Sequence, residues 1–437
     1  MADWIGAAAA AQRLGIKQAS LYSYVSRGVL TRRTGPDGRA SLFDAGEVES
    51  LARKGRPRRE PGSAELVISS ALTEIGADRF WYKGLDATVL ATSRTFEEVA
   101  SLLWTGSPDA APAPWHATSE AIAVGSAAQA ALPAGTLPLE RLQVIVPALA
   151  ATDPLRLQLD PPVVVASARG LIAGLADCLP RAAPSAAGDG AAGSQGTAGS
   201  HGAAADSSVQ PGPGTGSGTG GAAGTSIAAR LAARLCPHPD RPGLTAVLQA
   251  ALVLLADHEL AASTLAARVA ASVRADPYAV VATGLGAVGG ALHGGASLGA
   301  ELMLAAAREP SDAARVVGEL IRRGERIPGF GHFVYKTGDP RSVLLLSMIA
   351  GLAPDSPRLA VANAVLAEVR RRGLPEPNID FALAALADAT GMITGAGEAV
   401  FAVARSAGWL AHALEEYQRK KPIRPRSIYT GPPADPS

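Results

Sequence analysis

Cysteine is almost absent from this chain of 437 residues, and aromatic residues are scarce. Its two cysteines, Cys178 and Cys236, exclude a disulfide framework and a cysteine-based metal cluster, and they predict a reducing, cytoplasmic setting without a bound metal. Aromatic residues make up 4% of the chain although 48% of it is hydrophobic, so the core must be built from Ala, Leu and Val. This composition favours closely packed helices.

Long uncharged hydrophobic runs are also rare. The first ten residues, MADWIGAAAA, lack the basic and apolar regions of a secretory signal peptide. Residues 277–300 carry no charge for long enough to raise the question of a membrane span, but they are rich in glycine and contain His293. We therefore expect a buried segment of a soluble body and no membrane partner.

The net charge of +1 is distributed unevenly. Residues 1–60 carry a net charge of +5, and the remaining residues carry −4. A basic N-terminal segment attached to a slightly acidic body is typical of a separate module that binds a polyanion.

Residues 1–58 are predicted to form that module. Residues 7–15 and 18–27 each predict a short helix, two short strands should flank the Gly-Pro-Asp-Gly turn at 35–38, and Asp44 is suited to cap a third helix. This order resembles the winged helix-turn-helix of MerR-like and excisionase-like proteins, which implies binding to double-stranded DNA. The alternative is a basic interaction or dimerisation module.

Seven residues of this module are candidates for DNA contact. Those near the start of the second helix could reach base edges or phosphates, and those on the wing suit phosphate contact. The first group is Lys17, Gln18, Ser20 and Tyr22, and the second is Arg32, Arg33 and Arg39. Residues 54–63, KGRPRREPGS, are expected to be a linker.

Residues 181–226 are of low complexity. Of these 46 residues, 39 are Ala, Gly, Ser, Thr or Pro and none is aromatic, so they bury too little apolar surface to offset the entropy of ordering. We expect a disordered insertion in a loop.

The remaining chain, residues 59–180 and 227–437, is predicted to be a mainly α-helical body. Apolar residues recur at a spacing of three to four in seven segments, namely 226–235, 244–273, 299–307, 312–324, 342–352, 358–373 and 401–420. A small hairpin is possible within residues 66–84, and little after residue 90 resembles a strand.

Three of the seven histidines stand in unusual surroundings. His258 lies between Asp257 and Glu259, His293 has glycines on both sides, and His332 follows Gly-Phe-Gly. Glycine lets a backbone approach a ligand closely, and neutral histidine can donate or accept a proton near pH 7. The others, His116, His201, His238 and His412, give no such signal; His412 is at helical spacing and is expected on a surface or in the core.

One carboxylate and four cations complete the set of candidates. Asp380 opens an apolar helix and is either its N-cap or a base held at the helix entry. The segment RIPGFGHFVYKTGDPRS, residues 326–342, supplies Lys336 and Arg341, and Arg405 and Arg424 follow. Arginine suits a bidentate grip on carboxylates.

These motifs together resemble the citrate synthase family from about Glu65 to Tyr429, apart from the insertion. The segments that carry the resemblance occur in the family's order: TFEEVASLLWTG, LLADHELAASTLAARV, GALHGGAS, PGFGHFVYKTGDPR, PNIDFALAAL, FAVARSAGWLAH and IRPRSIYTG. The resemblance implies an all-helical body of a large and a small domain, usually a homodimer. Its activity would be the condensation of acetyl-CoA with oxaloacetate and water to citrate and CoA, a reaction of the tricarboxylic acid cycle.

The resemblance also implies roles for single residues. Asp380 would remove a methyl proton of acetyl-CoA, His293 would stabilise the enol or enolate, and His332 would protonate the oxaloacetate carbonyl. His258, Arg341, Arg405 and Arg424 would hold oxaloacetate, the last from the partner subunit. Lys336 would face a CoA phosphate, and the backbone at Gly329, Gly331 and Phe333 would receive the adenine. No cofactor is implied besides the acyl-CoA substrate.

Two departures from the family pattern affect substrate choice. Ser297-Leu298 follows Gly-Gly-Ala where many members have Asn-Glu, and Ala261-Ala262 stands where many bacterial members have Asn-Ala. Two alternatives stay open. One is a 2-methylcitrate synthase that uses propionyl-CoA, because one methylene is worth only about 1–3 kcal/mol of discrimination. The other is a regulator in which the N-terminal module binds DNA and the citrate-synthase-like body senses CoA esters or oxaloacetate.

Overall fold

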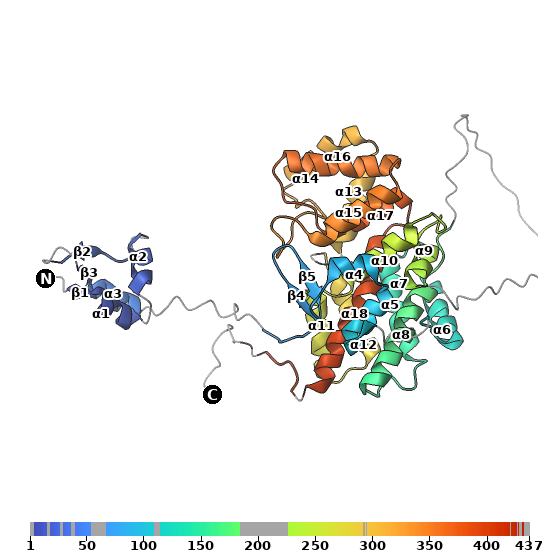
Figure 1. Ribbon diagram of the computed structural model, residues 1–437, viewed down its shortest axis with the longest axis horizontal. Coiled ribbons are helices and arrows are strands. Elements are labelled where there is room, and N and C mark those ends of the chain that lie inside the picture. Colours follow the sequence, from blue (N-terminus) through green and yellow to red (C-terminus); the bar gives the residue numbers. More distant parts are fainter. Residues whose placement is uncertain are drawn as a thin grey trace, which may run out of the picture. The chain divides into compact units, whose positions relative to one another are not determined.

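The computed structural model describes residues 4–14, 18–26, 29–35, 40–53, 67–108, 114–183, 226–291, 293, 295–419, 421–425, 427 and 431. Contacts within the chain divide it into two compact units (Figure 1). One comprises residues 1–69 and 424–437, and the other residues 70–423.

The first unit combines three short helices with a three-stranded antiparallel sheet. In chain order its elements are β1 (Trp4–Gly6), α1 (Ala7–Leu14), α2 (Gln18–Ser26), β2 (Arg32–Thr34), β3 (Ser41–Asp44) and α3 (Ala45–Arg53), with strand order β1-β3-β2. A core of Ala10, Leu21, Leu30, Phe43 and Val48 joins the helices to the sheet.

The predicted helices and strands of this unit are present. Asp44 Oδ1 accepts a hydrogen bond from the Glu47 N–H at 3.0 Å, which confirms the expected cap. Strand β1 was not predicted, because three residues carry too little periodicity; it pairs Ile5 with Phe43. Whether the unit acts as a winged helix-turn-helix stays a prediction.

Several predicted features fall outside the described residues. These include Lys17, Arg39 and the predicted linker, residues 54–63, together with residues 184–225 of the predicted insertion. Of the DNA-contact candidates that the structure describes, Gln18, Tyr22, Arg32 and Arg33 are exposed.

The second unit is a helical body with one small sheet. Antiparallel strands β4 (Thr73–Ile75), β5 (Phe80–Tyr82) and β6 (Leu85–Asp86) confirm the predicted hairpin and extend it by one strand. Past residue 90 the described residues form helices and loops, and no strand. The helices of the first half are α4 (Ala87–Ser93), α5 (Phe96–Thr105), α6 (Ser119–Ala130), α7 (Pro138–Ala150), α8 (Pro161–Cys178), α9 (Ile227–Leu235), α10 (Leu244–Leu255), α11 (Ala262–Ser272) and α12 (Pro277–Val288).

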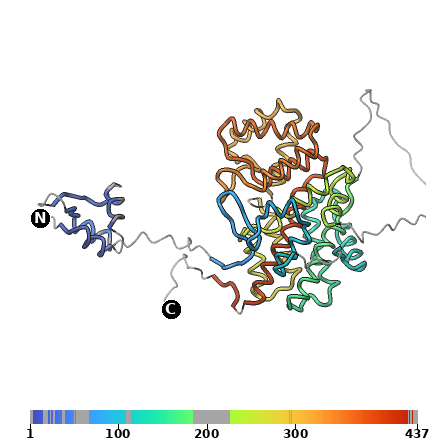
Figure 2. Tube along the Cα trace, in the orientation of Figure 1, coloured from blue at the N-terminus to red at the C-terminus, as the bar shows by residue number. Residues whose placement is uncertain are grey.

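The second half adds helices that separate into two lobes. They are α13 (Gly295–Ala306), the 3-10 helix η2 (Pro310–Asp312), α14 (Ala313–Arg322), α15 (Pro340–Leu352), α16 (Pro357–Arg371), α17 (Ile379–Thr390) and α18 (Ala396–Gln418). Side chains of α13, α14, α16 and one face of α17 form a separate small core. We call this group the small lobe and the rest of the unit the large lobe. Figures 1 and 2 show two masses of helix; α15, drawn with the upper mass, packs Leu345 and Ile349 into the core of the large lobe.

Helix α18 runs through the large lobe and is buried along nearly its whole length (Figure 1). Its side chains reach α5, α7, α8, α10 and α12. It joins the small lobe through Glu301 of α13, whose carboxylate accepts the N–H groups of Gly395 and Gly397 at 2.7 and 3.0 Å. Because a helix start leaves N–H groups without partners, this carboxylate serves as an external cap.

The apolar run 244–273 does not form one helix. Helix α10 ends at Leu255 and α11 begins at Ala262, with Glu259 at φ 54° in the connection. No glycine or proline marks this break in the sequence, so it depends on contacts made by the folded chain. The break places His258 in a loop between the lobes rather than on a helix.

Among the described helices, α8 is long and apolar enough to cross a membrane when only length and composition are considered. However, 61% of it is buried within the body. Residues 277–300 are not one helix, because α12 ends at Val288 and α13 begins at Gly295.

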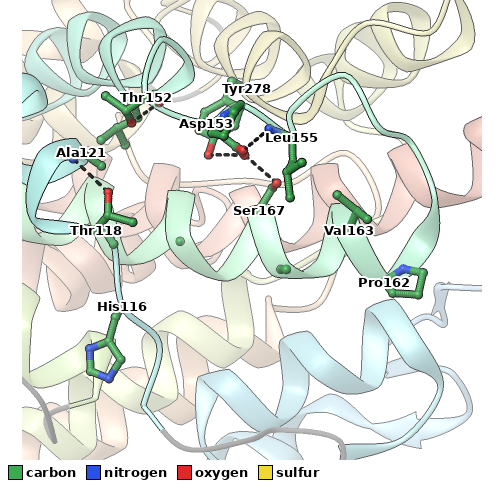
Figure 3. A pocket seen from close by; sticks show the side chains of 15 residues that line it. His116, Thr118, Ala121, Thr152, Asp153, Leu155, Pro162, Val163, Ser167 and Tyr278 are labelled. Atoms are coloured by element: carbon green, nitrogen blue, oxygen red, sulfur yellow. Dashed lines mark hydrogen bonds between the residues drawn. The ribbon is translucent and has the colours of Figure 1, made fainter.

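Beside α8 lies a cavity of about 430 Å³ (Figure 3). There the Asp153 carboxylate accepts hydrogen bonds from Ser167 Oγ at 2.7 Å and Tyr278 Oη at 3.0 Å, which joins α8 and α12.

Candidate active site

A cavity of about 610 Å³ lies between the lobes, and six of the predicted site residues line it. They come from five separate segments of the chain. They are His258, His293, His332, Arg341, Asp380 and Arg405. Gly329, Gly331 and Phe333, predicted to contact CoA, also line it.

Two glycines shape the loop that follows α14. Gly329 and Gly331 both have φ of 80°, the left-handed region that suits glycine. A Cβ on Gly329 would lie 2.8–2.9 Å from atoms of Phe381, so side chains are excluded there by space as well as conformation. Asn378 fastens the loop: its N–H donates to Gly329 O and its Nδ2 to Gly331 O, both at 2.9 Å.

The backbone of this loop determines which nitrogen of His332 carries the proton. Nδ1 accepts the N–H groups of Val334 and Tyr335 at 3.1 and 3.3 Å. The neutral ring therefore carries its proton on Nε2. Burial and the charge of Arg341 lower the pKa of His332 to about 4, so the ring is neutral at pH 7.

Arg341 lies beside His332 and is held by Asp339. Its Nε and Nη2 donate to the two oxygens of Asp339 at 3.0 and 2.8 Å, a bidentate pair. Asp339 also accepts the Ile379 N–H at 3.1 Å, which joins the start of α15 to the start of α17. Burial opposes the charge on Arg341, yet Asp339 raises its pKa, so the guanidinium stays charged.

His258 faces the same loop from the large lobe. Its Nε2 lies 3.0 Å from Tyr335 Oη, and its ring meets that of His332 edge-on with centroids 5.4 Å apart. Burial, together with Arg341 and Arg405, lowers the pKa of His258 well below its usual value. The ring is a neutral hydrogen-bonding group at pH 7.

His293 lies between α12 and α13. Its Nε2 is 2.7 Å from Ser263 Oγ on α11, and its ring packs edge-on against Phe401 of α18 at 5.7 Å. Burial, followed by the charge of Arg405, lowers the pKa of His293 to about 4.

Asp380 lies in the first turn of α17, and it is not the N-cap. Asn378 is the cap, and its side-chain oxygen accepts the Asp380 N–H at 2.9 Å. The interpretation of Asp380 as a capping residue is therefore wrong, because the preceding polar residue performs that role and leaves the Asp380 carboxylate facing the cavity. Burial raises its pKa to about 7, against the opposing charges of Arg341 and Arg405.

Arg405 approaches the cavity from α18. Its Nε donates to Leu255 O at 2.8 Å, at the end of α10, and its guanidinium stacks on Phe401 at 4.6 Å. Burial lowers its pKa to about 10, which still leaves it charged at pH 7.

Other predicted residues lie at the margin or outside. Phe333 is 91% exposed at the cavity rim, and the exposed Lys336 ammonium lies 5.6 Å from the centre of its ring. Arg424 is exposed and belongs to the other unit of the chain, so its predicted role stays a prediction.

Sequence reasoning missed residues that orient the predicted ones: Ser263, Tyr335, Asp339, Asn378 and Phe401. Tyr335 and Asp339 occur inside the segment 326–342, where they could have been noticed. Ser263 and Phe401 gave no local signal, because their partners lie elsewhere in the chain.

The geometry suits acid–base chemistry on an anionic substrate. A carboxyl group with a pKa near 7 is a competent base at neutral pH, and neutral imidazoles can donate hydrogen bonds to a developing oxyanion. Two buried guanidinium groups supply positive charge for carboxylates. Within the described residues, no group of three or more His, Cys, Asp or Glu side chains is arranged to hold a metal ion.

The chain belongs to the citrate synthase family. The family description "Citrate synthase, C-terminal domain" matches residues 63–426, most of the chain. Citrate synthase 2 of Bacillus subtilis is 40% identical over 185 residues, which cover 42% of this chain and 50% of that protein. Putative citrate synthase 2 of Mycobacterium tuberculosis is 38% identical over 208 residues, which cover 46% and 56%. The chain thus spans about half the length of these curated relatives.

Solved structures show the same fold at low sequence identity. Citrate synthase from Thermotoga maritima aligns with a TM-score of 0.62 and 24% identity, over 86% of this chain and 96% of that one. The enzyme from Thermoplasma acidophilum, solved as a ternary complex with carboxymethyl coenzyme A and oxaloacetate, aligns with a TM-score of 0.62 and 22% identity, over 85% and 96%. The body therefore has the citrate synthase fold.

Proposed function

We propose that the protein condenses acetyl-CoA with oxaloacetate and releases citrate and CoA. The observation that carries this proposal is the meeting of a base with a pKa near 7, three neutral imidazoles and two buried guanidinium groups in one cavity between two lobes. The Thermoplasma relative binds a CoA analogue and oxaloacetate, which supports the same substrate pair here.

In this proposal, Asp380 removes a proton from the methyl group of acetyl-CoA. The thioester is a very weak acid, so the oxyanion must be stabilised as the proton leaves. His293 would donate that hydrogen bond from Nδ1, which requires its Nε2 to accept from Ser263 Oγ at 2.7 Å. A preorganised donor of this kind is worth about 3–4 kcal/mol.

The new C–C bond then joins the methyl carbon to the carbonyl carbon of oxaloacetate. His332 would donate its Nε2 proton to the carbonyl oxygen, which becomes the hydroxyl of citryl-CoA. His258, Arg341 and Arg405 would bind the oxaloacetate carboxylates. Water finally cleaves the C–S bond and gives citrate and the CoA thiol. The location of the cavity between two lobes is suited to closure that excludes water until condensation is complete.

A thiol-release assay tests this function. CoA should appear from acetyl-CoA only when oxaloacetate is present. The same assay with propionyl-CoA examines the alternative of a 2-methylcitrate synthase, and a larger kcat/KM with propionyl-CoA would favour that alternative. Absence of thiol release with either acyl-CoA would refute the enzymatic proposal.

We also propose that the N-terminal unit binds double-stranded DNA. Exposed Arg32 and Arg33 lie on β2, where Arg32 stacks on Tyr22 at 5.4 Å and Arg33 on Trp4 at 4.2 Å. The stacking holds two positive charges on one strand, which suits phosphate contact. Catalysis and DNA binding can coexist in one cytoplasmic protein. In that case the citrate-synthase-like body would also sense CoA esters or oxaloacetate.

Duplex binding by the full chain should weaken in an Arg32→Ala/Arg33→Ala variant. The matched control is Arg322→Ala/Arg323→Ala, which removes two exposed charges at the C-terminal end of α14. The logarithm of the binding constant should fall linearly with the logarithm of the salt concentration, and the slope should be shallower in the Arg32→Ala/Arg33→Ala variant. Equal affinity in the two variants would instead favour an interaction module.

A further inference from the structure

A cluster of mostly buried charged side chains adjoins the loop that carries His258 and has no part in the proposed chemistry. It consists of Asp257, Arg268, His412, Glu415 and Glu416. The side chains of Asp257, Arg268 and Glu416 are fully buried and that of His412 is 1% exposed, so the protein keeps charged groups out of water here. Such burial is costly unless the groups are mutually satisfied.

Arg268 organises one side of this cluster. Its Nε donates to Glu416 Oε1 at 2.7 Å, and its Nη1 donates to Glu415 Oε2 at 2.8 Å. Nη1 also lies 2.6 Å from Nδ1 of His412. A guanidinium group has donors only, so Nδ1 must be the acceptor and a neutral His412 ring must carry its proton on Nε2.

The protonated side of His412 faces Asp257. Nε2 lies 3.2 Å from Asp257 Oδ1, although the N–H is not aligned as in a straight hydrogen bond. The second oxygen of Asp257 accepts the hydroxyl of Thr73. Burial opposes the charge on Asp257, yet His412, Arg405 and Thr73 together lower its pKa.

Asp257 connects this cluster to the site. It directly precedes His258 in the loop after α10, and its backbone is held by Tyr82 Oη, which donates to Asp257 O at 2.9 Å. On α18, a Cβ at Gly408 would collide with Ala256 O and the Asp257 carboxylate, so the loop packs directly against the helix. Three α18 residues on one face, Arg405, Gly408 and His412, thus contact residues 255–257.

We propose that His412 is a positioning residue that acts through Asp257 on the loop that carries His258. His412 is not among the residues that line the cavity, so its effect on the reaction is indirect. It holds Asp257 against α18, and this orients His258 toward the substrate carboxylate. This inference rests on the proposed condensation and goes beyond it, because it assigns a role to a residue outside the cavity.

The test compares two variants at His412 with a control on the same helix. His412→Ala removes the contact, whereas His412→Gln keeps an amide N–H near the place of Nε2. The control is Tyr417→Phe, which removes a buried hydroxyl of α18 that donates to Ala275 O at 2.6 Å, away from Asp257. KM for oxaloacetate, KM for acetyl-CoA, kcat and the thermal midpoint are measured for each.

The expected result is selective. His412→Ala should raise KM for oxaloacetate about tenfold and leave KM for acetyl-CoA within about twofold. The reason is that the variant displaces His258, which binds oxaloacetate in the proposed function, and leaves the residues proposed to bind acetyl-CoA in place. His412→Gln should restore most of the oxaloacetate affinity, and Tyr417→Phe should lower the thermal midpoint without changing the ratio of the two KM values. Equal changes in both KM values, or a change in thermal midpoint alone, would overturn the proposal and leave a purely structural role.

A second measurement does not depend on turnover. In protein labelled with nitrogen-15 histidine, the His412 ring, assigned by its loss in His412→Gln, should show a protonated Nε2 and an unprotonated Nδ1 at pH 7. The opposite tautomer would overturn the proposal even if the enzyme is active. A wild-type protein that neither releases thiol nor binds oxaloacetate in calorimetry would refute the proposed function itself, and the positioning role with it.

Discussion

Nη2 of Arg341 lies 3.3 Å from Nε2 of His332. Because Nδ1 of His332 accepts two backbone N–H groups, Nε2 carries the proton, so both nitrogens are donors and neither can accept from the other. Two adjacent donors favour a shared acceptor between them. A carbonyl or carboxylate oxygen of a substrate would fit this position.

Arg341→Lys should therefore weaken oxaloacetate binding. Lysine cannot keep the bidentate pair with Asp339 and also donate beside His332, and we expect KM for oxaloacetate to rise about ten- to a hundredfold. Arg358→Lys is the matched control, since Arg358 Nε contacts both oxygens of Asp388 at 2.9 and 3.0 Å on the small lobe. An equal rise in KM in both variants would contradict a direct role for Arg341.

The pH dependence of kcat/KM should show an acid limb near pH 7. Asp380 has a pKa raised to about 7 by burial, and it acts as a base only when deprotonated, so activity should fall as the pH decreases through that value. His293 and His332, with pKa values lowered to about 4, stay neutral in this range and add no second limb. A single limb near pH 4 would show that burial does not raise the pKa of Asp380 in the active enzyme.

Replacement of the base provides a separate test. Asp380→Asn should lower kcat by at least about a hundredfold, because an amide cannot accept the methyl proton. Oxaloacetate should still bind in calorimetry, since the guanidinium groups of Arg341 and Arg405 are unchanged. Activity within a few-fold of the wild type would rule out the assignment.

Gly329 should tolerate substitution less well than other glycines with positive φ. Gly324 has φ of 69° and open space around its Cβ position, whereas a Cβ on Gly329 would contact the Phe381 backbone. Gly329→Ala should cost about 1–3 kcal/mol more in free energy of unfolding than Gly324→Ala, because it adds overpacking to the same backbone strain. Urea unfolding of the two variants measures the difference, and equal values would exclude the steric contribution.

Phe333 offers an exposed ring at the cavity rim beside Lys336. If this ring stacks on the adenine of acetyl-CoA, Phe333→Ala should raise KM for acetyl-CoA about tenfold and leave KM for acetyl-pantetheine, which lacks the adenosine, unchanged. Val343→Ala, at a side chain that is 65% exposed on α15, controls for the loss of exposed apolar surface. A parallel rise with both substrates would indicate that Phe333 shapes the loop instead.

The sequence by itself determined the helical body and the segment around His332. Apolar residues at a spacing of three to four depend only on local helix geometry, and Gly329 and Gly331 mark a loop because only glycine adopts their backbone angles at little cost. The hairpin and the cap of Asp44 were also found from local sequence.

Only the tertiary structure decided the features that depend on distant partners. The break between α10 and α11 has no glycine or proline to mark it, and in the fold Gly408 packs directly against Ala256 and Asp257 at this point. Asp380 and Asn378 are both suitable caps by residue type, and only the fold shows that Asn378 takes the role. In the sequence His412 is like any other histidine of a helix, and only its contacts with Arg268 and Asp257, remote in sequence, show that Nδ1 faces the guanidinium and Nε2 the carboxylate. Hydrogen-bond direction and burial are properties of pairs of residues, so a single local pattern cannot encode them.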